Sequence, residues 1–480
     1  MTHKLPALLL VVATAVACVT NPATGQRQFN LLSEQDEVAL GKQADAQVRQ
    51  EMGLYPDQGW QDYVNRVGQA LAKTSHRPQL PWTFAVVDAQ AINAFALPGG
   101  YIYLTRGILP FLHDEAEMAN VLGHEIAHVT ALHGATAYSR QQAAGLGIGI
   151  GRILAPPDQQ GWFTAAEASL GLLFLKHGRD AELEADRLGV GYAATSGWNP
   201  SGMAGMLSTL GRLSEASGSS RGVPNFLSTH PLPADRVEQV STVADAARTS
   251  SATRVNEAEF NRRLDGLVFG DSREQGMVRG RNFLHPILRI ALRFPQGWQV
   301  NNGAQQVAAM PEAENQQRVL LLEVVESGGR SPAQAGRARM QEAQLIERAG
   351  ENVTINGLQA FVGVFSGGTG NEAIVARVAF ISHGGRLYQV AGVASQNAFS
   401  QADPDFRETI GSFRGLSAAE ADRVQPARLD FYTARSGDTW ESLAKRSDGT
   451  VSASALAIMN GAQPSSRPAV GARVRVVIGG

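Results

Sequence analysis

The sequence predicts a multidomain protein: a mostly α-helical N-terminal domain with a metal motif, then an α+β domain, then a small βααβ module. Three observations predict this order. A His-Glu-x-x-His motif lies at residues 124–128, the pattern changes to alternating and continuous apolar runs at residue 281, and two turn motifs divide residues 430–478. A chain of 480 residues is long enough to form several domains with their own cores.

The metal motif has the sequence His-Glu-Ile-Ala-His. On a helix, His124 and His128 lie on one face, so both imidazoles can bind one metal ion. Glu125 lies about 100° further round the helix, where its carboxylate can reach a water molecule on the metal. This spacing is typical of zinc metallopeptidases, with two nitrogen ligands and a general base. The alternative is a surface helix with two histidines, but apolar Ile126 and Val129 indicate a buried helix.

A catalytic zinc site needs a third protein ligand and an open position for water. The pattern HExxHxxGxxH is excluded, because Ala131 and Gly134 stand where it requires glycine and histidine. A glutamate on a later helix is another source of the third ligand. Glu182 and Asp186 are both candidates, and they lie about one helical turn apart. One carboxylate can bind zinc while the other accepts a hydrogen bond from a ligating histidine and so fixes its ring. An ordinary acidic helix face is the alternative.

Four segments of the N-terminal half together carry a family resemblance. They are Asn93–Ile102, Leu122–Val129, Arg179–Asp186, and Ser228–Pro231 followed by Arg236. These segments resemble the HtpX- and BepA-type gluzincin peptidases, a family that includes the CAAX prenyl proteases. The resemblance implies a zincin-type metallopeptidase domain, mostly α-helical with a small edge sheet, over residues 27–265.

The resemblance also implies a set of site residues. Zinc would be bound by His124, His128 and Glu182, with Glu125 as the catalytic base and Asp186 supporting a ligand histidine from the second shell. The reaction would be hydrolysis of peptide bonds, in which zinc activates water and Glu125 moves its proton.

Two further features could belong to this site. His230 and Arg236 are candidates for stabilising the oxyanion. In related periplasmic members the equivalent histidine is thought to close the open zinc position, so His230 could be a stabiliser, a switch or both. A helix-capping His-Pro turn, with Arg236 paired to a surface acid, is the alternative. Phe95–Ile102 predicts an apolar strand ending in a Gly-Gly turn, which is either a peptide-binding edge or a core strand.

The N-terminus predicts export. Residues 1–18 have a weakly cationic start and an apolar run that is too short for a membrane span, as in a signal peptide. Cys18, the only cysteine, follows Ala-Val-Ala, which fits an ordinary cleavage site or a lipobox with an acylated cysteine. Residues 21–28 resemble the tether of lipoprotein members of the family, which favours lipidation. No disulfide can form within one chain, so packed cores must provide the stability.

The composition and the segments after the metal motif further limit the class of protein. The net charge of −2 and the absence of a basic run give no indication of nucleic-acid binding. Ala143–Ala155 and Ala165–Leu175 are apolar but short, and could form a lid, a surface for a membrane or partner, or two helices packed on the protease core. The absence of a convincing membrane span after the signal peptide favours the soluble BepA-like branch of the family.

Residues 281–416 predict an α+β accessory domain. Its strands are expected at Ile287–Phe294, Val319–Val325, Phe361–Phe365, Val375–Ile381 and Leu387–Val393, and its helices at Ala333–Ala349 and Asp403–Phe413. The order predicts one antiparallel sheet with helices on one face. The domain weakly resembles PsbP- and Mog-like folds. His285 and His383 are isolated and are expected to be structural, so a binding or positioning role is expected.

The C-terminal part is expected to consist of a linker at 417–429 and a module at 430–478. In the module, Gly437-Asp438-Thr439 should lead into a first helix, capped by Asp438 or Thr439, and Asn460-Gly461 should end a second helix. This arrangement resembles a LysM domain, which implies binding of N-acetylglucosamine glycans such as peptidoglycan. A βααβ packing module without glycan affinity is the alternative.

These features together predict a zinc metalloendopeptidase of the envelope of a diderm bacterium. We expect one zinc per chain, a periplasmic location with an outer-membrane anchor at Cys18, and unfolded or misassembled envelope proteins as substrates. One alternative is an assembly chaperone with a latent zinc site. Another is a peptidoglycan-cleaving enzyme, which is disfavoured because the zinc motifs match a peptidase family.

Overall fold

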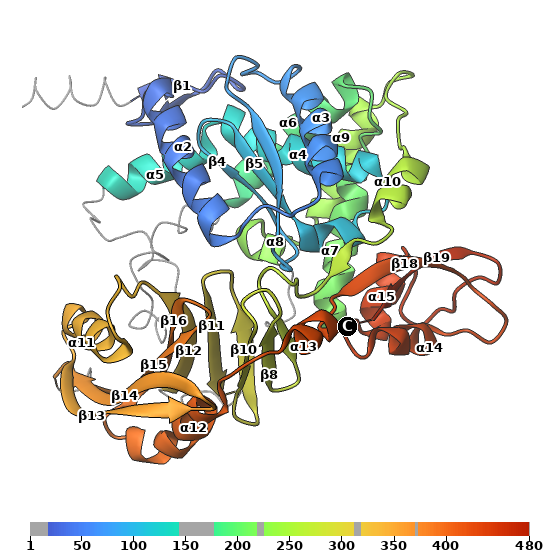
Figure 1. The fold of residues 1–480 in the computed structure, drawn as a ribbon. Helices are drawn as coiled ribbons and strands as arrows, with labels where there is room; N and C mark the ends of the chain where they lie inside the picture. The colour runs from blue at the N-terminus through green and yellow to red at the C-terminus, as the bar shows by residue number, and fades with distance from the viewer. Residues whose placement is uncertain (1–17, 144–176, 218–224, 312–317, 370–372, 480) are drawn as a thin grey trace, which may run out of the picture. The chain divides into compact units, whose positions relative to one another are not determined.

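The computed structural model describes residues 18–143, 177–217, 225–311, 318–369 and 373–479, which form two compact units (Figure 1). The first unit extends to Leu267 and also includes Arg428–Ile478, and the second comprises Val268–Ala427. In the described part of the chain, no helix has the length and apolar character needed to cross a membrane. The predicted signal peptide before Cys18 and the apolar segments at 144–155 and 165–175 lie outside the described residues.

The first unit is mostly helical with a small sheet, as the sequence predicts. Its helices before residue 268 are α2 (Glu34–Glu51), α3 (Gln58–Ala72), η1 (Arg106–Phe111), α4 (Glu115–Thr130), α5 (His133–Ala143), α6 (Arg179–Thr195), α7 (Gly202–Ser217), α8 (Asn225–Thr229), α9 (Arg236–Ala247) and α10 (Glu257–Leu264). Its strands there are β1 (Cys18–Thr20), β2 (Arg27–Phe29), β3 (Thr83–Val87), β4 (Ala94–Leu97) and β5 (Tyr101–Thr105).

The small sheet has the order β3-β5-β4, with β5 parallel to β3 and antiparallel to β4. Strand β4 is therefore at an edge of this sheet. The single strand predicted at Phe95–Ile102 is wrong: the segment is a hairpin that reverses between Leu97 and Tyr101. Gly99 and Gly100 make the reversal possible, because both have positive φ (78° and 101°). This backbone conformation costs a residue with a side chain more free energy than it costs glycine.

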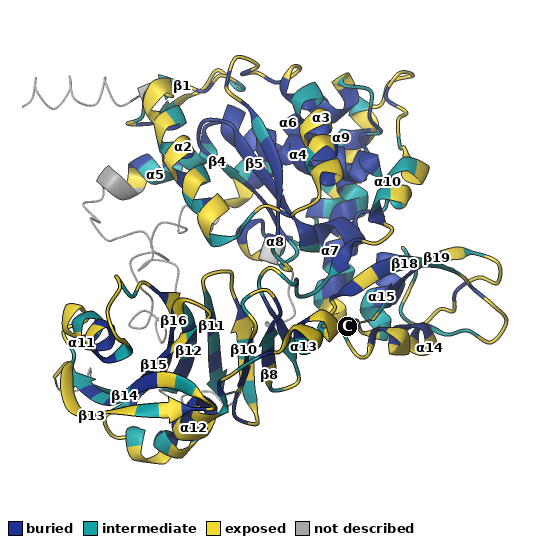
Figure 2. Cartoon of the chain, viewed as in Figure 1, coloured by how far each residue is buried: buried dark blue, intermediate teal, exposed yellow. Residues whose placement is uncertain are grey.

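Helix α4 carries the metal motif and lies at the centre of the first unit (Figure 2). Every one of its residues is buried, and Asp114 caps its N-terminus by accepting a hydrogen bond from the amide of Glu117. Helix α6 packs directly against it where Gly123 faces Gly189. A Cβ on Gly189 would lie 2.6 Å from the amide nitrogen of His124, so only glycine allows this approach. The close contact brings both motif-bearing helices to one site.

The first described residues form a short hairpin. Strands β1 and β2 pair antiparallel, with Cys18 opposite Phe29. The expected tether at residues 21–28 is instead the turn and second strand of this hairpin. It is held in place because the side chain amides of Asn21 and Gln28 both donate to the carbonyl oxygen of Ala131, each at 3.1 Å.

The C-terminal module has the predicted order of elements. It consists of β18 (Ala427–Thr433), α14 (Trp440–Ala444), η6 (Lys445–Ser447), α15 (Ala453–Met459) and β19 (Arg473–Ile478), with β18 and β19 antiparallel. Thr439 caps α14 in a capping box with Ser442, and Gly461 has a positive φ (68°) after Asn460 ends α15. The module packs within the first unit, because Arg475 donates hydrogen bonds to the carbonyl oxygens that follow η1.

The second unit is a sheet-rich α+β domain. Its elements are β6 (Val268–Phe269), β7 (Met277–Arg279), β8 (Asn282–His285), β9 (Ile290–Arg293), β10 (Trp298–Asn302), β11 (Gln306–Pro311), β12 (Arg318–Val325), α11 (Pro332–Glu342), β13 (Ile346–Ile355), β14 (Leu358–Gly367), β15 (Ile374–His383), β16 (Arg386–Ser395), α12 (Phe399–Ser412), β17 (Arg414–Gly415) and α13 (Ala418–Arg423). Seven strands form an antiparallel sheet in the order β10-β11-β12-β16-β15-β14-β13.

Several expectations for this unit are not met. The strand expected at Ile287–Phe294 is present as β9, but it belongs to a separate sheet of order β17-β9-β8-β7 instead of the single sheet predicted. The helix expected at Ala333–Ala349 ends at Glu342, and the chain then enters β13 after Gln344 turns it with a φ of 59°. The residues expected to be a linker, 417–429, contain α13, whose Ala421 is buried in a small cluster with Ala291.

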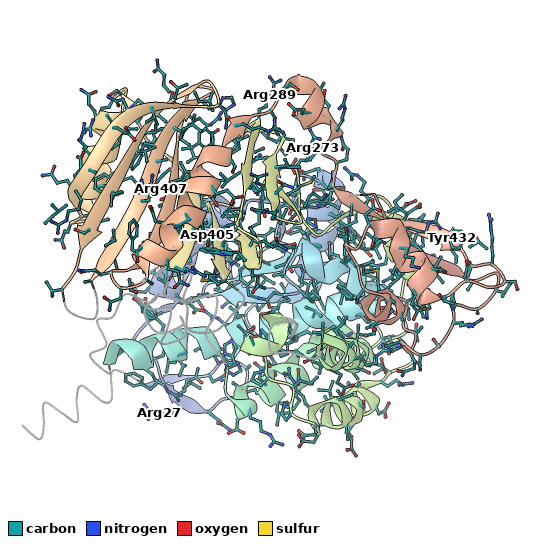
Figure 3. The ribbon with its side chains drawn as sticks, turned by 90° about the horizontal axis from the view of Figure 1, so that it is seen from below. Arg27, Arg273, Arg289, Asp405, Arg407 and Tyr432 are labelled. Atoms are coloured by element: carbon teal, nitrogen blue, oxygen red, sulfur yellow. The ribbon has the colours of Figure 1, made fainter. Side chains whose placement is uncertain are left out.

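The helices of this unit also lie on opposite faces of the large sheet, not on one. Phe380 of β15 pairs with Gln389, and this face receives α11, because Gly336 contacts the Phe380 ring. Gly392 of β16 projects to the other face and contacts Phe406 of α12. Two polar residues of α12, Asp405 and Arg407, are labelled in Figure 3.

The two isolated histidines of the accessory domain have structural partners. His285 is buried and accepts a hydrogen bond from the amide of Leu288 at 3.3 Å. His383 lies 3.0 Å from the carbonyl oxygen of Arg289. Both contacts agree with the structural role expected for these residues.

Candidate metal centre

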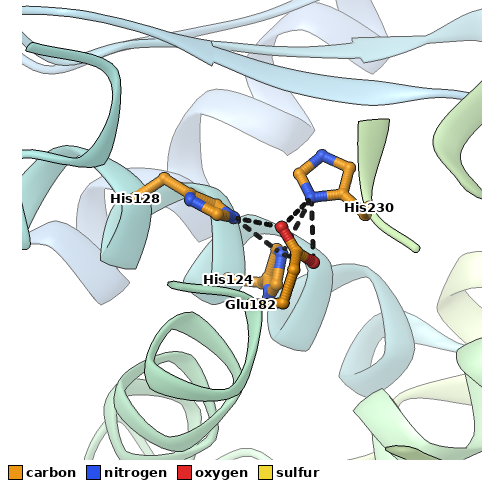
Figure 4. Close-up of side chains that lie close together, drawn as sticks. All are labelled: His124, His128, Glu182 and His230. Atoms are coloured by element: carbon orange, nitrogen blue, oxygen red, sulfur yellow. Dashed lines mark hydrogen bonds and ion pairs between the residues drawn. The ribbon is translucent and has the colours of Figure 1, made fainter. Parts of the chain in front are cut away.

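The ligand candidates from α4 and α6 converge in the core of the first unit (Figure 4). His124 Nε2 and His128 Nε2 lie 3.0 Å apart. The Glu182 carboxylate faces both rings, with one oxygen 3.6 Å from His124 Nε2 and the other 3.4 Å from His128 Nε2. All three side chains are buried, so they can reach one ion without a bulk-water shell.

These distances fit a single metal ion. Ligands at about 2.0–2.1 Å from a tetrahedral zinc lie about 3.3 Å from one another. The three separations among the two imidazoles and the carboxylate, from 3.0 to 3.6 Å, bracket that value. The donor set of two imidazole nitrogens and one carboxylate is also one that zinc prefers. The residues present therefore fit the metal that the sequence predicts.

His230 reaches the same centre from the end of α8. Its Nδ1 atom lies 3.0 and 3.2 Å from the two Glu182 oxygens and 3.3 Å from His124 Nε2. The ring stacks on Phe226 with centroids 4.3 Å apart, which holds it in this position. Four possible ligand atoms, from His124, His128, Glu182 and His230, thus lie within 4.8 Å of one another.

Two buried side chains surround the carboxylate end of this cluster. Asp186 lies 2.9 Å from His124 Nδ1, on the side of the ring that faces away from the other ligand candidates. Arg236 binds Asp186 with two hydrogen bonds, of 2.8 and 2.9 Å. A third nitrogen of Arg236 lies 2.8 Å from Glu182 and donates to the carbonyl oxygen of Pro231 at 2.8 Å.

Glu125 is buried beside His230 at the same cluster. Among the described residues, its Oε1 atom has no hydrogen-bond partner, and it lies 3.6 Å from His230 Nε2. Burial raises the pKa of Glu125 above its ordinary value, although the nearby histidines oppose this. A buried carboxyl oxygen without a hydrogen-bond partner, beside candidate metal ligands, has the position and the raised basicity that proton transfer requires.

The electrostatics keep the ligand candidates in metal-binding forms. Burial, followed by repulsion from neighbouring histidines, lowers the pKa of His128 well below its ordinary value, so the ring is neutral at pH 7. Burial alone would raise the pKa of Glu182, but His230, His124 and Arg236 together lower it, so this carboxylate is ionised. Neutral imidazole and ionised carboxylate are the forms that bind zinc.

A cleft leads to this centre along the small sheet. Its walls include Phe95, Leu97 and Pro98 from the edge strand β4 and the turn after it, and Glu125 and His128 from α4. The predicted strand beside the site therefore lines the cleft at an edge of its sheet.

Three residues near the centre were missed by the sequence interpretation. The His177 ring stacks on His128 with centroids 3.9 Å apart, and burial lowers the pKa of His177 to about 3. His133 Nδ1 lies 2.9 Å from His128 Nδ1, and Glu184 lies 3.0 Å from His133 Nε2. His133 and Glu184 each lie within a few residues of a motif, but only the fold shows that they meet.

A family model matches part of the helical unit. Residues 60–244, which include both motif-bearing helices and the His230 segment, match the model of peptidase family M48. The M48 region includes every candidate ligand described above, and these peptidases depend on a metal.

The chain is also similar to named proteases over about half of its length. It is 33% identical over 235 residues to the beta-barrel assembly-enhancing protease of Yersinia pestis, covering 47% of each chain. It is 30% identical over 243 residues to that of Escherichia coli K12, covering 49% of each. Mitochondrial metalloendopeptidase OMA1 of Schizosaccharomyces pombe is 28% identical over 48% of this chain and 68% of its own. The chain thus spans about half the length of the two bacterial relatives.

A solved structure also matches part of the chain. Cyanobacterial PsbP (CyanoP) from Synechocystis sp. PCC 6803 covers 30% of it at 12% identity and a TM-score of 0.24, which is too low to assign a fold.

Proposed function

We propose that this protein is a zinc-dependent endopeptidase of the bacterial cell envelope. One observation carries the proposal: the buried imidazoles of His124 and His128 and the Glu182 carboxylate converge with separations close to those in a tetrahedral zinc site, and Glu125 lies beside them with one oxygen free of hydrogen bonds among the described residues. The similarity of residues 60–244 to M48 peptidases supports the same chemistry.

Each residue has a defined part in the proposed reaction. Zinc, when bound, polarises the scissile carbonyl and makes water more acidic. Glu125 accepts the proton of the attacking water and delivers it to the leaving amine. Asp186 holds the His124 ring from its Nδ1 side.

Arg236 has a positioning role in this proposal instead of the oxyanion contact considered from the sequence. Its nitrogens already bind Asp186, Glu182 and a backbone carbonyl, and the side chain is 1% exposed. A buried guanidinium with four of its five N–H donors engaged in this way orients the two carboxylates and has little left to offer a substrate oxygen.

His230 would close the fourth position of the site. Its Nδ1 atom lies among the ligand atoms, where a substrate carbonyl or water would have to enter. We therefore propose that the described arrangement is a latent one and that His230 must withdraw before a peptide is cut. Replacing His230 by alanine should raise the rate of peptide cleavage, whereas a transition-state stabiliser at this position would make the rate fall.

The substrate would be an extended segment of an unfolded protein. Edge strand β4 lines the cleft and can pair with a peptide backbone, which selects unfolded chains over folded ones. The name of the similar bacterial proteases connects them with β-barrel assembly. We propose misfolded or stalled envelope proteins as substrates of this chain.

We also propose a periplasmic location with two attachments. Cys18 would carry a lipid that anchors the protein to the outer membrane. Residues 430–478 would bind peptidoglycan as a LysM-like module. Tyr432 of β18, labelled in Figure 3, is a candidate glycan contact, because it is half-buried and the guanidinium groups of Arg446 and Arg435 lie 4.5 and 5.8 Å from its ring centroid.

Metal analysis of protein produced without residues 1–18 tests the proposed site. We expect about one zinc per chain in the wild type and a large loss in Glu182→Ala. Asp180→Ala is the matched control, because it removes an exposed carboxylate from the same helix. A well-folded wild type without zinc would contradict the site.

Cleavage of casein tests the activity. Glu125→Gln should retain zinc and lose cleavage by about 10²–10⁴-fold, because it removes the base and leaves the ligands. Activity in envelope assembly that survives this substitution would instead indicate a chaperone, and release of glycan fragments would indicate a peptidoglycan-cleaving enzyme.

A further inference from the structure

A second chain of polar contacts supports the metal centre from the His128 side. His128 Nδ1 lies 2.9 Å from His133 Nδ1, and His133 Nε2 lies 3.0 Å from a carboxylate oxygen of Glu184. The side chains of His128 and His133 are 3% and 9% exposed, so little water competes for these contacts. The chain therefore runs from a ligand histidine to a carboxylate at the edge of the core.

The backbone brings these groups together at the end of α4. Leu132 has a positive φ of 59°, which reverses the chain directly after α4 and points His133 back toward His128. Glu184 comes from the first turns of α6, two residues after Glu182. The same helix therefore supplies a ligand carboxylate and the carboxylate that ends this chain.

The protons in this chain can be arranged in only one way if His128 binds metal. Its Nε2 atom faces His124 and Glu182, so the neutral ring carries its hydrogen on Nδ1. That hydrogen is donated to Nδ1 of His133, which must then carry its own hydrogen on Nε2 and donate it to Glu184.

We propose that His133 and Glu184 are positioning residues that orient His128 for zinc, as Asp186 orients His124. The inference rests on the proposed zinc site and adds a second support to it. Each ligand imidazole is then connected to a carboxylate. His124 contacts Asp186 directly, and His128 is connected to Glu184 through the imidazole of His133. Such contacts fix the tautomer and the ring angle, and losing one typically weakens metal binding about 10–100-fold.

Zinc affinity, measured by competition with a chromophoric chelator on the full chain, tests this proposal. Glu184→Gln should weaken zinc binding about tenfold, because the amide replaces an ionised acceptor. His133→Asn keeps an acceptor for His128 but loses the contact to Glu184, so it should match Glu184→Gln. His133→Leu removes both contacts and should weaken binding further, by about 100-fold. Asp180→Asn, an exposed charge change on the same helix, should leave affinity within about twofold.

A double variant separates a connected chain from two unrelated contacts. Adding Glu184→Gln to His133→Leu should weaken zinc binding no further, because Glu184 acts only through His133. Thermal unfolding of each variant in excess chelator should match the wild type within a few degrees, which separates an effect on zinc from an effect on folding.

Two outcomes would overturn the proposal in distinguishable ways. If the wild type binds zinc and every His133 and Glu184 variant retains that affinity within twofold, the positioning role is wrong and the zinc site stands. If the wild type binds no zinc, the proposed site is wrong, and this inference is overturned with it.

Discussion

Replacing Arg475 by alanine should strongly destabilise the first unit, because this side chain joins the C-terminal module to the segment that precedes α4. The side chain is only 5% exposed. Its guanidinium donates to the carbonyl oxygens of Pro110, Leu112 and His113 at 2.9, 2.7 and 3.0 Å, and to the side chain of Asn261 at 2.7 Å.

The size of the effect follows from these four acceptors. Alanine leaves each of them without its donor, at a cost of about 1–3 kcal/mol apiece and so roughly 8 kcal/mol in total. Truncation also removes the cost of burying the charge. That burial lowers the pKa of Arg475 to about 10, a shift worth about 3 kcal/mol. The difference predicts a net loss of about 5 kcal/mol, at the upper end of the cost of breaking a buried charged pair.

Differential scanning calorimetry of the full chain would measure the loss. At about 2–4 °C per kcal/mol, the unfolding transition of the first unit should fall by on the order of 10 °C. Arg473→Ala is the matched control, because Arg473 lies on the same strand but is exposed, with its guanidinium over the Phe431 ring. The reasoning is refuted if Arg475→Ala lowers the transition no more than Arg473→Ala does.

Three further variants test other parts of the structure. Gly189→Ala places a Cβ 2.6 Å from the backbone of α4. The variant should lose about 1–3 kcal/mol of stability in thermal unfolding and should bind less zinc. Unchanged stability and zinc content would contradict the close packing of α4 and α6. Arg236→Lys cannot reproduce the bidentate bond to Asp186, so metal analysis should show weaker zinc retention. His285 has its pKa lowered to about 4 by burial. The unfolded chain, with an ordinary histidine pKa of about 6.5, therefore binds more protons between pH 4 and 6.5, and stability falls as the pH decreases through that range, by at most about 3 kcal/mol. His285→Asn keeps an acceptor for Leu288 and should flatten this dependence in denaturant titrations at pH 4.5 and 7.5; an equally steep dependence would exclude His285 as its source.

Local patterns in the sequence identified the ligand candidates of the metal centre. The spacing of His124 and His128 makes them neighbours on any helix, so their convergence required no knowledge of the tertiary fold. Glu182 was identified because its segment resembles a family motif. The contact between α4 and α6 that completes the site depends on two glycines facing each other, and no pattern within either helix indicates which glycines will meet.

In the sheet-rich unit, too, local sequence patterns predicted elements but not the contacts between them. Apolar alternation predicted strands, because a half-buried strand repeats every two residues. The pairing of those strands is non-local, so the sequence did not indicate that β9 belongs to a second sheet or that α11 and α12 lie on opposite faces. The start of the charged strand β13, residues 346–349, falls within the helix that the sequence predicts, because nearly all of this strand is exposed and it carries no apolar alternation.

The sequence by itself determined the order of domains, the helix that carries the metal motif, its ligand candidates and the caps of the C-terminal module. These features depend on residues within a few positions of one another, whose geometry the backbone sets. Only the tertiary structure decided that His230 lies among the ligand candidates, that Arg236 binds two buried carboxylates, and that His133 and Glu184 extend from His128. It also decided that the C-terminal module packs within the protease unit. Each of these depends on contacts between distant segments, which burial and close packing select when the whole chain folds.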